Sequence, residues 1–263
     1  MSKGHTYPLA GDVRRLGDFL LEIAKGRVPG HSLFRRFGYN AAIGATEEDI
    51  WSVSSNRTWL TTAISLRIAA GGDAEDDADG GDGAREITIQ YLDGNFVLQQ
   101  EALDTAGVGA SSNTSGDCIR FVRAWVSKAG LYTGDNEAAV VIETSDGGST
   151  QGHIVAGAGQ TEQTHYTVPA GKKAYLGPVE LTVNSNKAVD LFMYRREGAD
   201  VVAAPFTSRR EVHRWTGLVS PGKEEDFKFY EAFDEKTDIW FTGTASGGGG
   251  EASVDYGMII VDK

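Results

Sequence analysis

Short runs of alternating apolar and polar residues, separated by turn-forming residues, fill the chain from about residue 47 to its C-terminal end. Alternation with a period of two is the pattern of a strand with one buried face, and helices have a different period. Ile87 and Ile89 lie on one face of such a run, and Asp93-Gly94 separates it from a returning run that contains Phe96. An Asp-Gly pair between two alternating runs is a strong signal for a β-hairpin.

The same pattern predicts many further strands. Glycine accounts for 34 of the 263 residues without a fixed period, which favours many tight turns. Many short strands with no helix between them are typical of an all-β protein. The predicted fold is an antiparallel β-sandwich of jelly-roll type. Beyond residue 117 the strands are expected at 118–126, 137–144, 150–156, 163–168, 173–183, 188–196, 210–218, 225–233, 237–245 and 252–261.

The N-terminal segment has a different pattern. Residues 12–25 place Leu16, Leu20 and Ile23 on one stripe, which predicts a helix with Asp12 as its N-cap and Gly26 just after its end. A lone helix of this length is marginal in water, so it is expected to dock on its own body or on a neighbouring subunit. Residues 27–46 mix apolar and basic side chains without a period, which predicts an extended arm.

These patterns divide the chain into three parts. Residues 1–46 are predicted to form an N-terminal arm with one short helix. Residues 47–134 are predicted to form a first β region, and residues 135–263 a C-terminal jelly-roll-like β-sandwich.

Charge is distributed unevenly along the chain. The formal net charge is −12, which argues against a nucleic-acid partner because such proteins carry a basic face. Residues 1–37 nevertheless hold seven Lys/Arg and three Asp/Glu, so this segment carries +4 and the rest −16. A basic, partly apolar segment on an acidic body predicts a partner-binding surface. Its expected residues are Arg14, Arg15, Phe19, Leu20, Ile23, Arg35, Arg36 and Phe37.

No membrane segment or disulfide is expected. The first residues contain no apolar run of the kind found in signal peptides, and no stretch approaches the roughly 20 apolar residues of a membrane span. Cys118 is the single cysteine, so no intrachain disulfide can form, which suits assembly in a reducing cytoplasm. Its apolar neighbours predict a buried strand position.

The residue patterns predict no catalytic site, no cofactor and no metal site. The five histidines form no short metal-ligand motif, and no nucleophile elbow, phosphate loop or catalytic cysteine signature is present. The acidic loop at 73–82 has the oxygen ligands that Ca²⁺ prefers but not the spacing of an EF-hand, so a solvated loop is favoured over a calcium site. The five tryptophans are expected in the core or at interfaces, with sugar stacking as the alternative.

Several short segments, taken in their order along the chain, carry a family resemblance. They are Val28-Pro29-Gly30-His31-Ser32, Phe37-Gly38-Tyr39-Asn40, Glu48-Asp49-Ile50-Trp51, Leu92-Asp93-Gly94-Asn95-Phe96, Tyr166-Thr167-Val168-Pro169-Ala170-Gly171-Lys172, Glu235-Lys236-Thr237-Asp238-Ile239 and Ile259-Ile260-Val261-Asp262. From about residue 28 to the C-terminal end, the chain resembles a family of virion structural proteins of tailed bacteriophages, common among marine and cyanobacterial phages.

The resemblance implies a non-enzymatic virion component that is assembled in the host cytoplasm. The favoured role is a capsid decoration (cement) protein that bridges and stabilises capsomers. Its expected partners are the major capsid protein and sister subunits in a homotrimer, with no nucleic acid, membrane or small-molecule substrate. The alternatives are a tail or fibre component that contacts the host surface and a carbohydrate-binding module.

Overall fold

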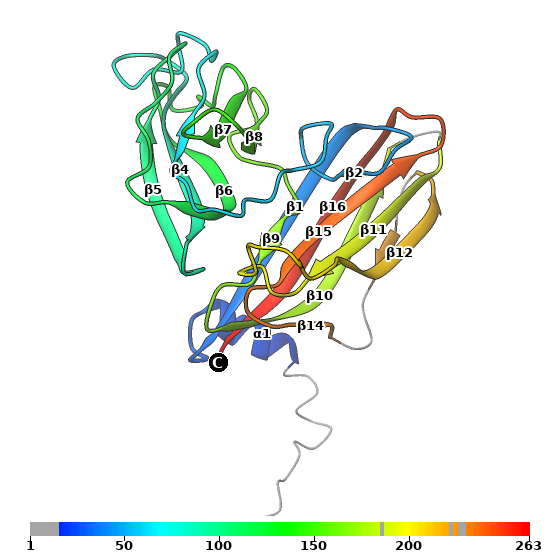
Figure 1. Cartoon of the computed structure of the whole chain (residues 1–263). Helices are drawn as coiled ribbons and strands as arrows, with labels where there is room; N and C mark the ends of the chain where they lie inside the picture. Colours follow the sequence, from blue (N-terminus) through cyan, green and yellow to red (C-terminus); the bar gives the residue numbers. More distant parts are fainter. Residues whose placement is uncertain (1–15, 185–186, 221–222, 226–229) are drawn as a thin grey trace, which may run out of the picture.

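The computed structural model describes residues 16–184, 187–220, 223–225 and 230–263, and these form two β-rich bodies that lie side by side (Figure 1). We call the larger body the main sandwich. It contains strands from both ends of the chain. The smaller body, the inserted lobe, is built from the chain between the second strand of the main sandwich and its third.

The main sandwich contains strands β1 (His31–Ile43), β2 (Glu48–Asp49), β9 (Tyr166–Thr167), β10 (Lys172–Val183), β11 (Val189–Arg196), β12 (Arg210–Leu218), β13 (Lys223–Glu225), β14 (Ala232–Phe233), β15 (Asp238–Ala245) and β16 (Gly250–Asp262). The inserted lobe contains β3 (Leu66–Ile68), β4 (Ala84–Asp93), β5 (Leu98–Asp104), β6 (Cys118–Ala129), β7 (Val140–Thr144) and β8 (Thr150–Ile154). One helix, α1 (Leu16–Ala24), precedes β1.

The main sandwich is a jelly roll. One sheet has the order β1-β16-β10-β13, with β14 also paired to β10, and the other has the order β12-β11-β15-β2, with β9 also paired to β15. Four pairs of strands that follow each other along the chain have one member in each sheet. These pairs are β1 and β2, β10 and β11, β12 and β13, and β15 and β16. The chain therefore wraps around one core, as a jelly roll requires. This topology confirms the predicted all-β fold class.

Alternation places the apolar side chains of the sandwich strands in that core. Val254, Tyr256 and Met258 on β16 face inwards, as their spacing predicts, and each is at most 3% exposed. They pack against inward residues of the opposite sheet, such as Leu191 and Phe241. Burial of a large apolar side chain contributes about 1.5–3 kcal/mol, so these strands supply most of the driving force for the sandwich.

The prediction of an extended arm is wrong for residues 31–43. They form β1, which pairs antiparallel with β16 from His31 opposite Val261 to Ile43 opposite Gly250. The inward face of β1 carries Arg36, Gly38 and Asn40 in place of apolar residues, and all three are buried. A strand whose buried face is polar lacks the alternation by which sequence patterns are recognised.

The predicted division at residues 46 and 134 also differs from the observed one. Strands β7 and β8 join β3 in a sheet of the inserted lobe, although the prediction assigned residues 140–154 to the C-terminal sandwich. The first strand of the jelly roll, β1, comes from the predicted N-terminal arm, and the second, β2, comes from the predicted first β region. Local patterns predict where strands lie, but not which strands pair.

Helix α1 docks on its own chain. Ile23 is buried, and the ring of Phe19 lies 6.1 Å from the ring of His31 at the start of β1. Gly26 follows the helix with a φ of 69°, which confirms its predicted position, whereas the predicted N-cap Asp12 lies outside the described residues. Within the described part of the chain, no helix has the length and apolar character needed to cross a membrane.

The predicted hairpin is present, with a longer turn than expected. Asp93 ends β4, and its carboxylate accepts the backbone N–H groups of Asn95 and Val97 at 2.8 and 3.0 Å. Phe96 lies in this turn at a φ of 61°, not on the returning strand. Its side chain is buried against Ala199 of the main sandwich, so the turn helps to join the two bodies.

A buried ion-pair network joins the inserted lobe to the main sandwich, and we call this contact region the lobe junction. Arg120 of β6 donates from Nε to Oδ1 of Asp238 on β15 at 2.9 Å, and both side chains are at most 2% exposed. Asp238 also accepts hydrogen bonds from Thr167 at 2.7 Å and from Arg196 at 2.8 Å. Two cations and a hydroxyl thus satisfy one buried carboxylate, which makes the network stable only as a set.

We expect Asp238→Ala to destabilise the fold by about 3–5 kcal/mol, because it leaves Arg120 buried without its carboxylate. Urea unfolding followed by circular dichroism measures this loss. The control is Asp234→Ala, which removes a surface carboxylate paired with Lys173 and should cost less than about 1 kcal/mol. Equal losses in the two variants would contradict a structural role for the network.

Candidate functional site

The residues predicted to bind a partner do not all lie on one surface. Arg14 and Arg15 lie outside the described residues. Phe19 and Leu20 are 44% and 38% exposed on α1, whereas Ile23 is 3% exposed and packs inwards. Ile23 therefore docks the helix on its own chain, while Phe19 and Leu20 stay accessible to solvent.

An apolar groove of about 490 Å³ lies beside α1, over the outer face of the sheet formed by β1, β10 and β16. Leu33 is 46% exposed and Tyr230 is 55% exposed at this groove. Its wall includes Leu20, Leu33, Phe34, Tyr230, Met258 and Ile259. Arg35 lies at the groove and forms an ion pair with Asp255 of the neighbouring strand. The groove is thus an apolar surface with a charged margin.

Arg36, predicted on the same partner surface, is instead buried at the lobe junction. Its Nη2 donates to the backbone carbonyls of Val122 and of His165, the latter at 2.6 Å. Burial lowers the pKa of the Arg36 guanidinium to about 10. Alternation explains this placement, because residues 35 and 36 of a strand point to opposite faces.

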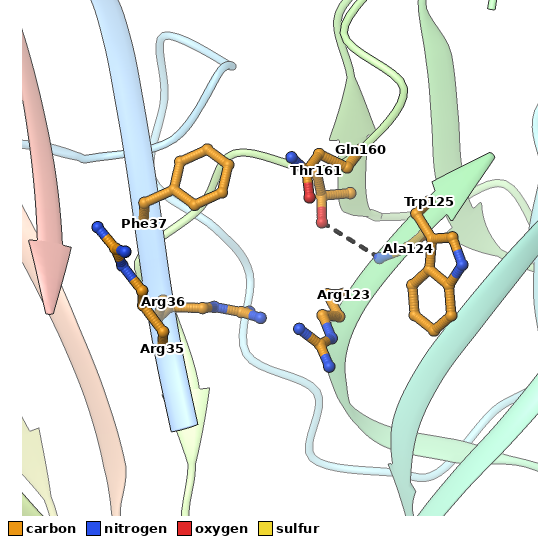
Figure 2. Close-up of a pocket in the computed structure, with 8 residues that line it drawn as sticks. All are labelled: Arg35, Arg36, Phe37, Arg123, Ala124, Trp125, Gln160 and Thr161. Atoms are coloured by element: carbon orange, nitrogen blue, oxygen red, sulfur yellow. Dashed lines mark hydrogen bonds between the residues drawn. The ribbon is translucent and has the colours of Figure 1, made fainter. Parts of the chain in front are cut away.

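A second cavity, the interlobe pocket, lies between β1 and β6 and has a volume of about 220 Å³ (Figure 2). Figure 2 shows Arg36 and Arg123 extending towards each other from these two strands. The pocket is lined by Arg35, Arg36, Phe37, Arg123, Ala124, Trp125, Gln160 and Thr161. Thr161 accepts the backbone N–H of Ala124 at 3.1 Å, which fixes residues 160–161 against β6. The prediction included Phe37 but missed Arg123, because one arginine in a strand-like run carries no signal of its own.

A buried histidine–carboxylate pair lies close to the same junction. His165 Nε2 lies 2.8 Å from Oδ2 of Asp49, which also accepts the backbone N–H of Arg57 at 2.7 Å. The rings of Trp51 and Trp59 meet the imidazole edge-on at 5.6 and 5.5 Å. No short motif links residues 49, 57 and 165, so this cluster could not be found from sequence patterns.

The tryptophan prediction is confirmed for Trp51, Trp215 and Trp240, which are buried, whereas Trp59 and Trp125 are partly exposed. The rings of Trp59 and Trp240 meet at 5.4 Å beside a third cavity, the aromatic pocket, with a volume of about 330 Å³. Its lining combines these rings with Asp49, Asn56, Arg57, Arg196, Thr207 and Arg209. Aromatic faces beside polar side chains are the combination that the sugar-stacking alternative requires.

The acidic loop is tied into the inserted lobe by one of its own carboxylates. Asp76 is 3% exposed, and it accepts the backbone N–H groups of Ala84, Glu137 and Ala138 at 2.8–3.0 Å. Asp76 therefore has a structural role in the loop. Across residues 16–184, 187–220, 223–225 and 230–263, no three His, Cys, Asp or Glu side chains are grouped to hold a metal ion.

Cys118 is fully buried at the start of β6, as predicted, and is a free thiol. Burial raises the pKa of this thiol to about 12. The protonated thiol therefore behaves as a small apolar group in the core of the inserted lobe.

The comparisons with known proteins give only weak similarity. The sequence matches no protein-family model and no curated protein. Among solved structures, the VP2 subviral particle of infectious bursal disease virus is 8% identical, with a TM-score of 0.24 over 88% of this chain and 72% of that chain. T=1 particles derived from infectious bursal virus are 10% identical, with a TM-score of 0.22 over 89% and 74%. Such scores do not establish a shared fold, so the phage-family resemblance stays a prediction.

We expect His165 to make stability fall as the pH is lowered from about 7.5 to 5.5. Burial lowers the pKa of His165, although Asp49 opposes this shift, so the unfolded chain binds the proton more readily. The loss begins near the ordinary histidine pKa of about 6.5 and can reach about 1.4 kcal/mol per pH unit. Partial burial lowers the pKa of His153 and adds to the same trend.

Urea unfolding at pH 7.5, 6.5 and 5.5 measures this dependence. His165→Gln should reduce the slope of unfolding free energy against pH, and His153→Gln should reduce it by less, because His153 is only partly buried. An unaltered slope in His165→Gln would show that another group is responsible.

Proposed function

We propose that this chain is a virion structural protein, a capsid decoration protein that binds the major capsid protein and sister subunits in the assembled particle. The observation that carries the proposal is the apolar groove beside α1. The rigid jelly roll presents this groove to solvent together with the exposed residues Phe19, Leu20 and Leu33.

The groove has the character of a protein-binding surface. Soluble proteins seldom leave large apolar side chains grouped on their surface unless a partner covers them. Here the helix adds Phe19 and Leu20, the sheet adds Leu33, and Tyr230 extends the groove. An apolar centre with charged groups at its margin, such as Arg35 and Asp255, matches the usual anatomy of an interface.

Two further arguments support a particle component. Jelly rolls are used in viral capsids and also in lectins and cupins, so the fold is compatible with the proposal without selecting it. The short segments from Val28-Pro29-Gly30 to the C-terminal end resemble, in the same order, those of phage virion proteins. This resemblance favours a capsid role over a lectin or cupin role. A homotrimer at a three-fold position would present several grooves at once, and linked weak contacts gain strength through effective concentration.

The test is binding of the purified chain to phage capsids that lack it, measured by co-sedimentation. Leu20→Asp combined with Leu33→Asp should weaken binding at least about ten-fold, since charges in an apolar interface are costly. Both residues are partly exposed, so the fold should be retained. The matched control is Val108→Asp with Val155→Asp, two exposed positions on the inserted lobe. Equal binding by the two double variants would refute the groove as the binding surface.

A deletion can test the N-terminal segment only if it ends before His31, because β1 is the edge strand of the jelly roll. Removal of residues 1–30 should therefore reduce capsid binding while circular dichroism stays that of a β protein. Undiminished binding would exclude a role for this segment.

A tail or fibre component that binds host glycans is the second candidate, and the aromatic pocket is the observation that favours it. A glycan array with the purified chain tests this role. Bound glycans should be lost in Asn56→Ala combined with Arg209→Ala, two exposed residues of the pocket, and retained in Arg214→Ala. An array without any bound glycan would remove this candidate.

A further inference from the structure

Two guanidinium groups share the interlobe pocket without a carboxylate between them. Among the described residues, Arg36 donates only to backbone carbonyls, and Arg123 donates to the side-chain oxygen of Gln90 at 2.8 Å. Within the described residues neither arginine forms an ion pair. Arg35, the third arginine of the lining, is paired with Asp255.

Arg36 is the more unusual of the two, because it is 4% exposed and its Nε is buried without a hydrogen-bond partner. The charge of Arg123 across the pocket adds repulsion to this cost of burial. The buried Arg120 shows the contrast, since it meets Asp238 through two hydrogen bonds. A buried cation without a counter-ion is unfavourable.

The walls of the pocket hold Arg123 in position. Its guanidinium lies 5.6 Å from the centre of the Trp125 ring and is fixed at Nε by Gln90. Thr161 and Gln160 close the side between the strands. Because a water molecule fills roughly 30 Å³ in the liquid, a cavity of about 220 Å³ has room for a small anion with some of its water.

We propose that the interlobe pocket binds an oxyanion, a phosphate or a carboxylate group, with Arg36 and Arg123 as its cationic ligands. Guanidinium groups form short, charge-assisted hydrogen bonds with these anions, often through two parallel donors. An anion here would offset the positive charge of the pocket and link β1 of the main sandwich to β6 of the inserted lobe. This proposal does not depend on the apolar groove or on a role in a capsid.

The experiment is isothermal titration calorimetry of the full chain with inorganic phosphate and, separately, with acetate, at constant ionic strength set by NaCl. Arg123→Gln should weaken binding of the preferred anion at least about ten-fold, because one charge-assisted contact is lost. Arg123 is exposed, so this variant should fold. Arg214→Gln removes the same charge from a surface pair with Glu211 and should bind as the unchanged protein does.

The two anions identify the chemistry. Tighter binding of phosphate indicates a phosphoryl ligand, and tighter binding of acetate indicates a carboxylate, such as an acidic side chain of a partner. Heat signals that match NaCl alone, or equal anion affinity in Arg123→Gln and Arg214→Gln, would overturn the proposal. The Leu20→Asp and Leu33→Asp double variant should bind the anion normally, which separates this site from the groove.

Discussion

The pairing of Arg120 with Asp238 at the lobe junction is the interaction on which the arrangement of the two bodies depends. Each body has its own apolar core, and neither core fixes the orientation of one body relative to the other. The ion pair fixes β6 against β15, and the buried turn at Phe96 adds an apolar contact beside it. Because buried charges tolerate few geometries, a polar junction specifies one orientation more sharply than an apolar one of similar area.

The segments that carry the phage-family resemblance meet at or near this junction. In Phe37-Gly38-Tyr39-Asn40, Gly38 lies so close to the Ile50 carbonyl that a Cβ would approach it to 2.6 Å. Asn40 donates to the carbonyl of Asp49 at 3.2 Å, which links two of the segments. Asp238 and Phe96 come from two others. The resemblance thus follows residues that hold the architecture together, while the apolar groove lies mostly outside them.

Much of the strand content was predictable, because strands of the jelly roll that bury one apolar face alternate clearly. β16 and β11 are clear examples, and Asp93-Gly94 marked a real hairpin. The pairing of β1 with β16 and of β3 with β7 was not predictable, since alternation shows which face of a strand is buried but not which strand it pairs with. The candidate sites were harder still. Arg36 belongs to the junction because a neighbouring lobe covers it, and Arg123 reaches the same pocket from a strand about ninety residues away in sequence.

The long sequence separation between β1 and its partner β16 has a consequence for synthesis on the ribosome. The inserted lobe consists of consecutive strands, so it can fold as soon as β8 has emerged. The jelly roll cannot close until β16 has emerged, and β1 waits until then without the strand that pairs with it. Until β16 emerges, the unpaired edge of β1 is open to pairing with strands of nascent chains on neighbouring ribosomes.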